Sequence, residues 1–66
     1  MAEKYKDYTI IVNADIDDAS KLWNGRFRIM SDESIVVYES FSDPSSSEEQ
    51  AKMTATSSAK RWVDQQ

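Results

Sequence analysis

Groups that could perform catalysis are scarce in this sequence. It contains no histidine and no cysteine, so the usual proton-transfer and thiolate nucleophile residues are both missing. The single glycine also argues against a glycine-rich phosphate loop. Carboxylates remain the only plausible acid–base groups, and we therefore expect a protein that is not an enzyme and has no cofactor.

Three carboxylates, Asp15, Asp17 and Asp18, lie together in one polar stretch. Oxygen ligands at alternate positions suit Ca²⁺ or Mg²⁺. The stretch lacks the glycine and the later glutamate of an EF-hand loop. We therefore interpret residues 15–21 as a solvated acidic loop rather than a metal site, with a short helical turn at 17–22 as an alternative.

Two arginines, Arg26 and Arg28, alternate in a predicted strand, so their side chains share one face of a sheet. With Asn24 and Tyr38 they would form a small binding surface, because arginine and aromatic residues are enriched in interface hot spots. The same arginines could instead contact nucleic-acid phosphates. These four residues are the candidate binding site of the sequence.

The overall charge favours a simpler interpretation of the arginines. With 8 basic and 12 acidic residues the net charge is −4, which argues against a general nucleic-acid binder. Cross-strand pairing with Glu33 or Glu39 then accounts for both arginines. No apolar run approaches the roughly 20 residues of a membrane span, and residues 1–6 lack the apolar core of a signal peptide. We expect a cytoplasmic protein without membrane contact.

Residues 46–64 are predicted to form one long C-terminal helix. Pro44 ends the preceding segment, because it lacks the N–H that a strand ladder needs. The three serines at 45–47 are followed by Glu48, Glu49 and Gln50, which offers three overlapping capping boxes and leaves the first helical residue open. The apolar stripe of this helix recurs at helical spacing. It consists of Ala51, Ala55, Ala59 and Trp62.

Three strands are predicted before the helix, at about 5–14, 22–30 and 35–41, and residues 1–4 are expected to be loose. The first contains a β-branched run at 9–12, and the second shows the cleanest alternation of apolar and polar residues. Gly25, inside the second strand, indicates a bulge or a close approach, which we expect to admit an aromatic side chain of the helix.

These elements predict an α+β fold with the order β-β-β-α in one domain over residues 1–66. A long C-terminal helix would pack on one face of a three-stranded antiparallel sheet, since this arrangement buries each apolar stripe. Truncation of Trp62 to alanine should then cost roughly 3–5 kcal/mol. The expected structural anchors are Trp23, Phe27, Ala51, Ala55, Ala59 and Trp62.

Several short motifs resemble small uncharacterised bacterial proteins of unknown function. The segment from Trp23 to Ile29 matches their Trp-x-x-x-Phe-x-Ile strand, and the segment 59–64 matches their final helix, of the Ala-x-x-Trp-Ile/Val-Asp kind. The resemblance covers most of residues 8–64. It implies a three-strand sheet followed by a C-terminal helix, and it implies no activity.

A looser fold likeness is to HicB-like antitoxins and to double-stranded RNA-binding domains, which also pack a helix on a strand-rich sheet. The chain lacks the glycine-containing segment and the DNA-binding extension of the former. It also lacks the first helix of the latter and has Glu48 and Glu49 where their final helix begins with basic residues. The likeness is an analogy of fold, which does not establish function.

The small size of the chain limits how a stable fold can be reached. A domain of about 60 residues buries only about 60% of its unfolded surface, and without cysteine no disulfide can stabilise it. A sufficient core or oligomerisation must supply the stability. We therefore expect a small, acidic protein-interaction module that binds a protein partner or forms a homodimer. The alternative is a nucleic-acid-associated domain that uses the sheet face with Arg26 and Arg28.

Overall fold

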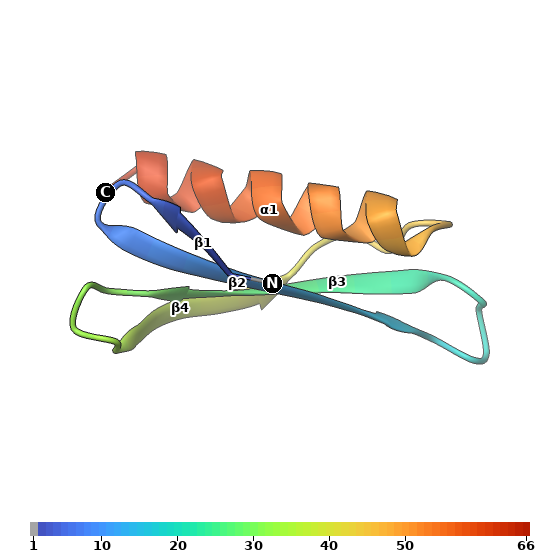
Figure 1. The fold of residues 1–66 in the computed structure, drawn as a ribbon. Helices are drawn as coiled ribbons and strands as arrows, with labels where there is room; N and C mark the ends of the chain where they lie inside the picture. Colours follow the sequence, from blue (N-terminus) through green and yellow to red (C-terminus); the bar gives the residue numbers. More distant parts are fainter. Residues whose placement is uncertain (1) are drawn as a thin grey trace.

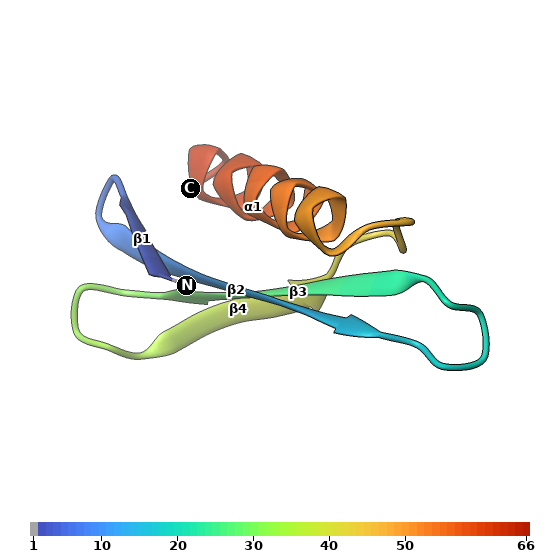
Figure 2. The ribbon, with the colours of Figure 1, turned by 45° about the vertical axis from the view of Figure 1, so that its right-hand side comes forward.

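The computed structural model describes residues 2–66, which form a four-stranded antiparallel sheet and one helix (Figure 1). The strands follow one another across the sheet in chain order, so β1 and β4 are its two edges. The helix lies over one face of the sheet (Figures 1 and 2). The α+β class and the C-terminal helix are thus confirmed. The elements are β1 (Ala2–Tyr5), β2 (Tyr8–Ile16), β3 (Trp23–Met30), β4 (Val36–Phe41) and α1 (Glu48–Asp64).

The prediction of three strands is wrong, because the chain reverses direction at Lys6 and Asp7. Tyr5 pairs with Tyr8, so the expected strand at 5–14 is divided between β1 and β2. Residues 2–4, expected to be loose, belong to β1; Met1 lies outside the described residues. The reversal takes two residues, and it needs a backbone conformation that Lys6 supplies with a φ of 54°.

All three hairpins place a residue other than glycine in the left-handed region. These are Lys6, Lys21 with a φ of 61° and Ser34 with a φ of 63°. The β2–β3 hairpin is closed by the N–H of Asp17, which donates to the carbonyl of Leu22 at 2.8 Å. The N–H of Lys21 donates to the carbonyl of Asp17 at 2.7 Å. Residues 17–22 are therefore an ordered turn that includes one i→i+4 hydrogen bond.

The core lies between α1 and the face formed mainly by β2 and β3. Strand alternation directs Ile10 and Ile29 toward the helix, where they are 1% and 0% exposed. The helix contributes small side chains at every fourth position, which lets its backbone lie close to the sheet. The buried residues are Ile10, Val12, Phe27, Ile29, Ala51, Ala55, Ala59 and Val63.

Gly25 marks the closest approach of the helix to β3. A Cβ atom at this position would lie 2.5 Å from the carbonyl oxygen of Ala51 and against the hydroxyl of Ser42. The expected close approach is therefore present, but it is made by the helix backbone and not by an aromatic side chain. The Ser42 hydroxyl is buried there without a hydrogen-bond partner among residues 2–66.

The C-terminal end of the helix stripe differs from the predicted one. The residue that continues the four-residue spacing is Val63, which is 3% exposed, whereas Trp62 is only partly buried. Trp62 stacks on Tyr38 with ring centroids 5.1 Å apart, and it meets Tyr8 edge-on at 5.9 Å. Val63 follows Ala59 by four residues and so continues the row of alanines that faces the sheet. Trp62 follows Ala59 by three residues and lies to the side of that row.

The first turn of α1 resolves which of the three capping boxes is used. Ser47 is the N-cap, and its hydroxyl oxygen accepts from the N–H of Gln50 at 3.1 Å. Just before it, Trp23 and Ser45 exchange two backbone hydrogen bonds of 2.7 and 2.8 Å. This bridge joins the start of β3 to the segment that leads into the helix. Trp23 itself is only partly buried.

Candidate functional site

The carboxylates of the acidic loop do not come together as a cluster of ligands among the residues that the structure describes. No group of three or more potential metal-ligating side chains comes together in residues 2–66. Asp17 instead stabilises its own turn: one carboxylate oxygen accepts from the N–H of Ala19 at 3.2 Å and the other from the hydroxyl of Ser20 at 2.9 Å. Its carboxylate serves a structural purpose.

The candidate binding residues of the sequence divide between two faces of the sheet. Asn24, Arg26 and Arg28 alternate with the buried residues of β3 and so lie on the face away from the helix, which we call the open face. Tyr38 pairs with Ile29 and lies on the helix side, where it stacks on Trp62. The structure therefore does not bring Tyr38 together with the other three.

The two arginines have different surroundings. Arg28 lies opposite Glu39 of β4, and its Nε donates to the Glu39 carboxylate at 3.1 Å. Arg26 lies opposite Phe41 and forms no ion pair within residues 2–66. A concavity of about 320 Å³ is lined by these four side chains and Ser40. The cross-strand pairing expected between an arginine and Glu39 is therefore present for Arg28. Arg26 and Phe41 are the neighbouring residues that could contact a partner.

β4 carries four of the eight exposed large apolar side chains among residues 2–66, and a fifth lies just before the strand. Phe41 is 70% exposed, Val36 44%, Val37 43% and Tyr38 39%, and Ile35 just before the strand is 58% exposed. The helix packs on β2 and β3 and does not extend over β4 in the same way. We call the exposed side chains of residues 35–41 and the free backbone groups of this strand the β4 edge.

The pairing of β4 with β3 determines which backbone N–H and C=O groups of β4 face β3 and which point away from it. The N–H of Ser42 donates to the carbonyl of Gly25 at 2.9 Å, so Ser42 faces β3. Antiparallel ladders alternate, which directs Ser40 and Tyr38 toward β3 as well. The N–H and C=O groups of Glu39 and Phe41 therefore point away from the sheet. A register shift between Ile29 and Met30 interrupts this alternation of backbone groups before Tyr38.

A groove between β4 and the end of α1 adjoins the β4 edge on the helix side. It encloses about 250 Å³. Four aromatic residues line it, together with two serines and two longer polar residues at the C-terminal end of the helix. The lining residues are Phe27, Tyr38, Ser40, Phe41, Ser58, Arg61, Trp62 and Gln65.

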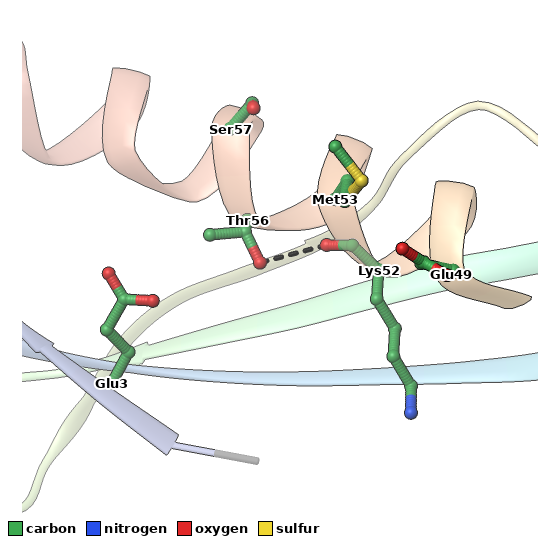
Figure 3. Close-up of a pocket in the computed structure, with 6 residues that line it drawn as sticks. All are labelled: Glu3, Glu49, Lys52, Met53, Thr56 and Ser57. Atoms are coloured by element: carbon green, nitrogen blue, oxygen red, sulfur yellow. Dashed lines mark hydrogen bonds between the residues drawn. The ribbon is translucent and has the colours of Figure 1, made fainter.

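A second concavity, of about 460 Å³, lies beside the first half of α1 (Figure 3). Glu3 of β1 borders it on one side, and helix residues including Met53 and Thr56 border it on the other. In Figure 3, Met53 and Ser57 point away from the sheet, and the Thr56 hydroxyl donates back to the carbonyl of Lys52 at 2.9 Å. None of the polar residues among residues 2–66 is fully buried, so this space offers no buried polar group that could recognise a ligand.

Charged groups at the junction of β1 and α1 hold these two elements together. The Lys6 ammonium and the Tyr5 hydroxyl both donate to Asp64, at 2.6 and 2.9 Å, and these hydrogen bonds lower the pKa of Asp64. The same contacts raise the pKa of Lys6 and of Tyr5. Lys60 contacts Glu3 at 2.8 Å, and this hydrogen bond raises the pKa of Lys60. We call these five residues the β1–α1 cluster. Their contacts with one another give each of them a structural role.

The β4 edge was not recognised in the sequence, although a signal was present. Ile35, Val36, Val37 and Tyr38 form a consecutive apolar run in place of alternation. Such a run is typical of a strand covered on both faces. In this fold the strand lies at an edge and the helix covers neither of its faces fully, so the same run becomes an exposed surface.

The fold and this surface define a class: an α+β domain whose antiparallel sheet has an exposed apolar edge strand. Comparisons with protein-family models, with curated proteins and with solved structures found no match for the chain. The resemblance to small bacterial proteins therefore stays a prediction. Within residues 2–66 there is no helix of the length and apolar character needed to cross a membrane.

Proposed function

We propose that this protein is a non-catalytic protein-interaction module whose contact surface is the β4 edge with the adjoining part of the open face. The observation that carries this proposal is the exposure of the β4 side chains, with Phe41 at 70%. Clustered apolar exposure of this kind marks interaction sites more often than singly scattered residues do.

The backbone of β4 supports the same function. An uncovered edge strand presents unpaired N–H and C=O groups, and these are a template for pairing with another strand. Natural edges are protected by lysine, proline or inward-pointing charges. Residues 36–41 contain neither lysine nor proline, and their one charge, Glu39, is paired with Arg28. Addition of a strand to such an edge is a recurring mode of protein recognition.

The side chains beside the edge are of the types found at interface centres. Phe41 and Arg26 lie opposite each other on the open face, and Tyr38 and Trp62 lie on the helix side of β4. Arginine, tyrosine and tryptophan are the residues most enriched in hot spots. A bound strand would therefore contact aromatic side chains above and below its own plane.

The charge distribution favours a protein over a nucleic acid as the partner. Arg28 is engaged by Glu39, which leaves Arg26 as the open-face arginine without an ion pair within the described residues. The chain as a whole carries a net charge of −4. A phosphate backbone requires several free cations along one surface, whereas a strand partner requires the backbone and apolar groups that β4 presents.

A matched pair of lysine substitutions tests the proposal. Phe41→Lys and Met53→Lys each replace an exposed apolar residue, 70% and 57% exposed, and change the net charge equally. In cross-linking of the tagged protein in native cells, the protein adducts should disappear with Phe41→Lys and persist with Met53→Lys. Equal adducts in both variants would remove β4 as the contact surface. Salt-dependent binding of a mixed oligonucleotide, lost with Arg26→Ala, would favour the nucleic-acid alternative instead.

A further inference from the structure

We infer that the partner of the β4 edge is a second copy of this chain, and that the two β4 strands pair antiparallel about Ser40 to form one continuous eight-stranded sheet. This inference rests on the proposed function and specifies the partner of that same surface.

The free backbone groups limit where a second strand can bind. Glu39 and Phe41 direct their N–H and C=O groups outward, and the irregularity before Tyr38 disrupts the alternation on that side. An antiparallel partner must therefore place its own outward-directed residues opposite these two. If Glu39 of one copy faces Phe41 of the other, four hydrogen bonds form, and Ser40 lies opposite itself in the intervening non-hydrogen-bonded pair.

The two registers centred on Glu39 and on Tyr38 are less favourable. A register centred on Glu39 places the two carboxylates directly opposite each other, and like charges in that position are destabilising. A register centred on Tyr38 sets Glu39 against Val37, where the bulge has displaced the regular ladder. The register about Ser40 uses only the regular part of the strand, from Tyr38 to Ser42.

The side chains are compatible with this register. On the open face, Phe41 of each copy would lie beside Glu39 of the other, and that carboxylate is already neutralised by Arg28. The Glu39–Arg28 pairs therefore add no net charge to the joint, although each chain carries −4. On the helix side the small Ser40 side chains meet at the twofold axis, so the backbones can approach without a steric conflict there.

The symmetry of the pairing determines what the dimer looks like. An antiparallel pair of identical strands has its twofold axis perpendicular to the sheet, so both helices lie on the same face. The grooves beside β4, each about 250 Å³, then adjoin across the axis. The Tyr38–Trp62 stacks of the two copies flank this joint groove. Parallel pairing would instead place the helices on opposite faces.

The self-complementarity of β4 favours a second copy over a different protein. The edge supplies both the template and a strand of suitable composition, with four β-branched or aromatic residues among the six of β4. A 66-residue chain also gains from association, because its own core is small. The same four outward groups that a partner must satisfy are present in every copy.

Sedimentation over a range of concentrations provides the first test. The wild-type protein should reach twice the 7.6 kDa of a single chain as the concentration rises. Phe41→Lys should raise the dimer dissociation constant at least about tenfold, which corresponds to about 1.4 kcal/mol, while Met53→Lys should leave it unchanged. A wild-type protein that remains at 7.6 kDa throughout would overturn the inference.

Single cysteines provide the second test and determine the register, because the chain has no cysteine of its own. Facing residues in a non-hydrogen-bonded pair have Cα atoms about 4.5 Å apart, within the range of a disulfide. Ser40→Cys should therefore form a disulfide-linked dimer in a glutathione redox buffer. Val37→Cys, away from the axis on the same strand, and Ser57→Cys, on the exposed side of α1, are the controls.

The cross-linking pattern separates the outcomes. Efficient linkage of Ser40→Cys alone supports antiparallel pairing about this residue. Equal linkage of Ser40→Cys and Val37→Cys indicates parallel pairing, and equal linkage of all three indicates random collision; either result overturns the inference. If self-pairing fails while the cellular adducts still depend on Phe41, the partner is a different protein and the proposed function stands.

Discussion

The two edge strands of the sheet, β1 and β4, differ in their contacts with the helix. β1 has only four residues, and its Glu3 and Tyr5 contact the last turns of α1. β4 is longer and more apolar, and apart from the contact between Tyr38 and Trp62 the helix leaves it uncovered. One edge is therefore closed by charged contacts, and the other is available for a partner.

The difference follows from where one helix can lie on four strands. α1 packs over β2 and β3, and β1 rises toward the C-terminal end of the helix, as Figures 1 and 2 show. A helix with its side chains is about 10–12 Å wide, whereas neighbouring strands are about 4.8 Å apart. Since one helix can cover roughly two or three strands, an uncovered edge is the geometric consequence, and the sequence places its most exposed apolar residue, Phe41, on it.

The largest expected difference between the covered side and β4 comes from two truncations. Ile29→Ala removes a fully buried side chain and should lower the free energy of unfolding by about 2–5 kcal/mol. Phe41→Ala, at 70% exposure, should change the unfolding free energy of the monomer by less than about 0.5 kcal/mol. Urea denaturation at a concentration where the protein is monomeric measures both. A large loss with Phe41→Ala would show that β4 supports the core.

Gly25→Ala should destabilise the covered side by about 1–3 kcal/mol. The added Cβ would meet the carbonyl oxygen of Ala51 at 2.5 Å, and this oxygen belongs to the helix backbone, so the helix must move away from β3. Thermal unfolding of the variant measures the loss. Ala14→Gly, on the neighbouring strand opposite Gly25, is the control for a change of similar size without added volume. An unchanged melting temperature for Gly25→Ala would contradict the close packing described above.

Trp62→Ala should have an intermediate effect, because this residue connects the covered side to β4. Its ring is only partly buried, so we expect a loss of about 2 kcal/mol in place of the 3–5 kcal/mol expected for a buried aromatic residue. Loss of the stack on Tyr38 should also broaden or shift the NMR signals of β4. Trp62→Phe keeps an aromatic ring and is the control. Unchanged β4 signals in Trp62→Ala would show that Trp62 does not connect the helix-covered part of the sheet to β4.

The parts of the fold that repeat a strong local pattern could be predicted from the sequence. The alanine spacing and the serine-rich start indicated α1, and the alternation in residues 23–30 indicated β3. The predicted stripe ends at Trp62, three residues after Ala59, because a step of three also keeps to one face of a helix. The packing selects Val63, because a helix this close to a sheet has no room for an indole in the same row.

The missed elements have weak local signals. The turn at Lys6 and Asp7 contains neither glycine nor asparagine, and its left-handed residue is a lysine, so nothing in the sequence indicated that β1 exists. The pairing with β2 and the contacts of Tyr5 with Asp64 stabilise it, and these are separated by up to 59 residues. The exposure of β4 likewise depends on which strands the helix covers, which is a tertiary property.

The smallest expected effect is electrostatic and concerns the closed edge. The hydrogen bonds from Lys6 and Tyr5 hold the pKa of Asp64 below its usual 3.8. A lowered pKa in the folded state means that the contribution of Asp64 to stability is complete above the unfolded pKa and is lost as the pH falls through the folded value. For Tyr5 and Lys6 the pKa values are raised, so their contributions are present below about 10 and are lost at higher pH.

Asp64→Asn should therefore lower the melting temperature slightly at neutral pH, and the difference from the wild type should begin to shrink near pH 3.8 and disappear only below the lowered pKa of the folded state. Only a small shift is expected, because the ion pair is exposed to solvent and is screened by salt. Asp43→Asn removes the same charge from an exposed carboxylate that forms no ion pair within residues 2–66, and it is the control. If both variants follow the same pH profile, the contacts of Lys6 and Tyr5 with Asp64 do not contribute to holding β1 against α1. The contact between Lys60 and Glu3 would then be the charged contact left to close this edge.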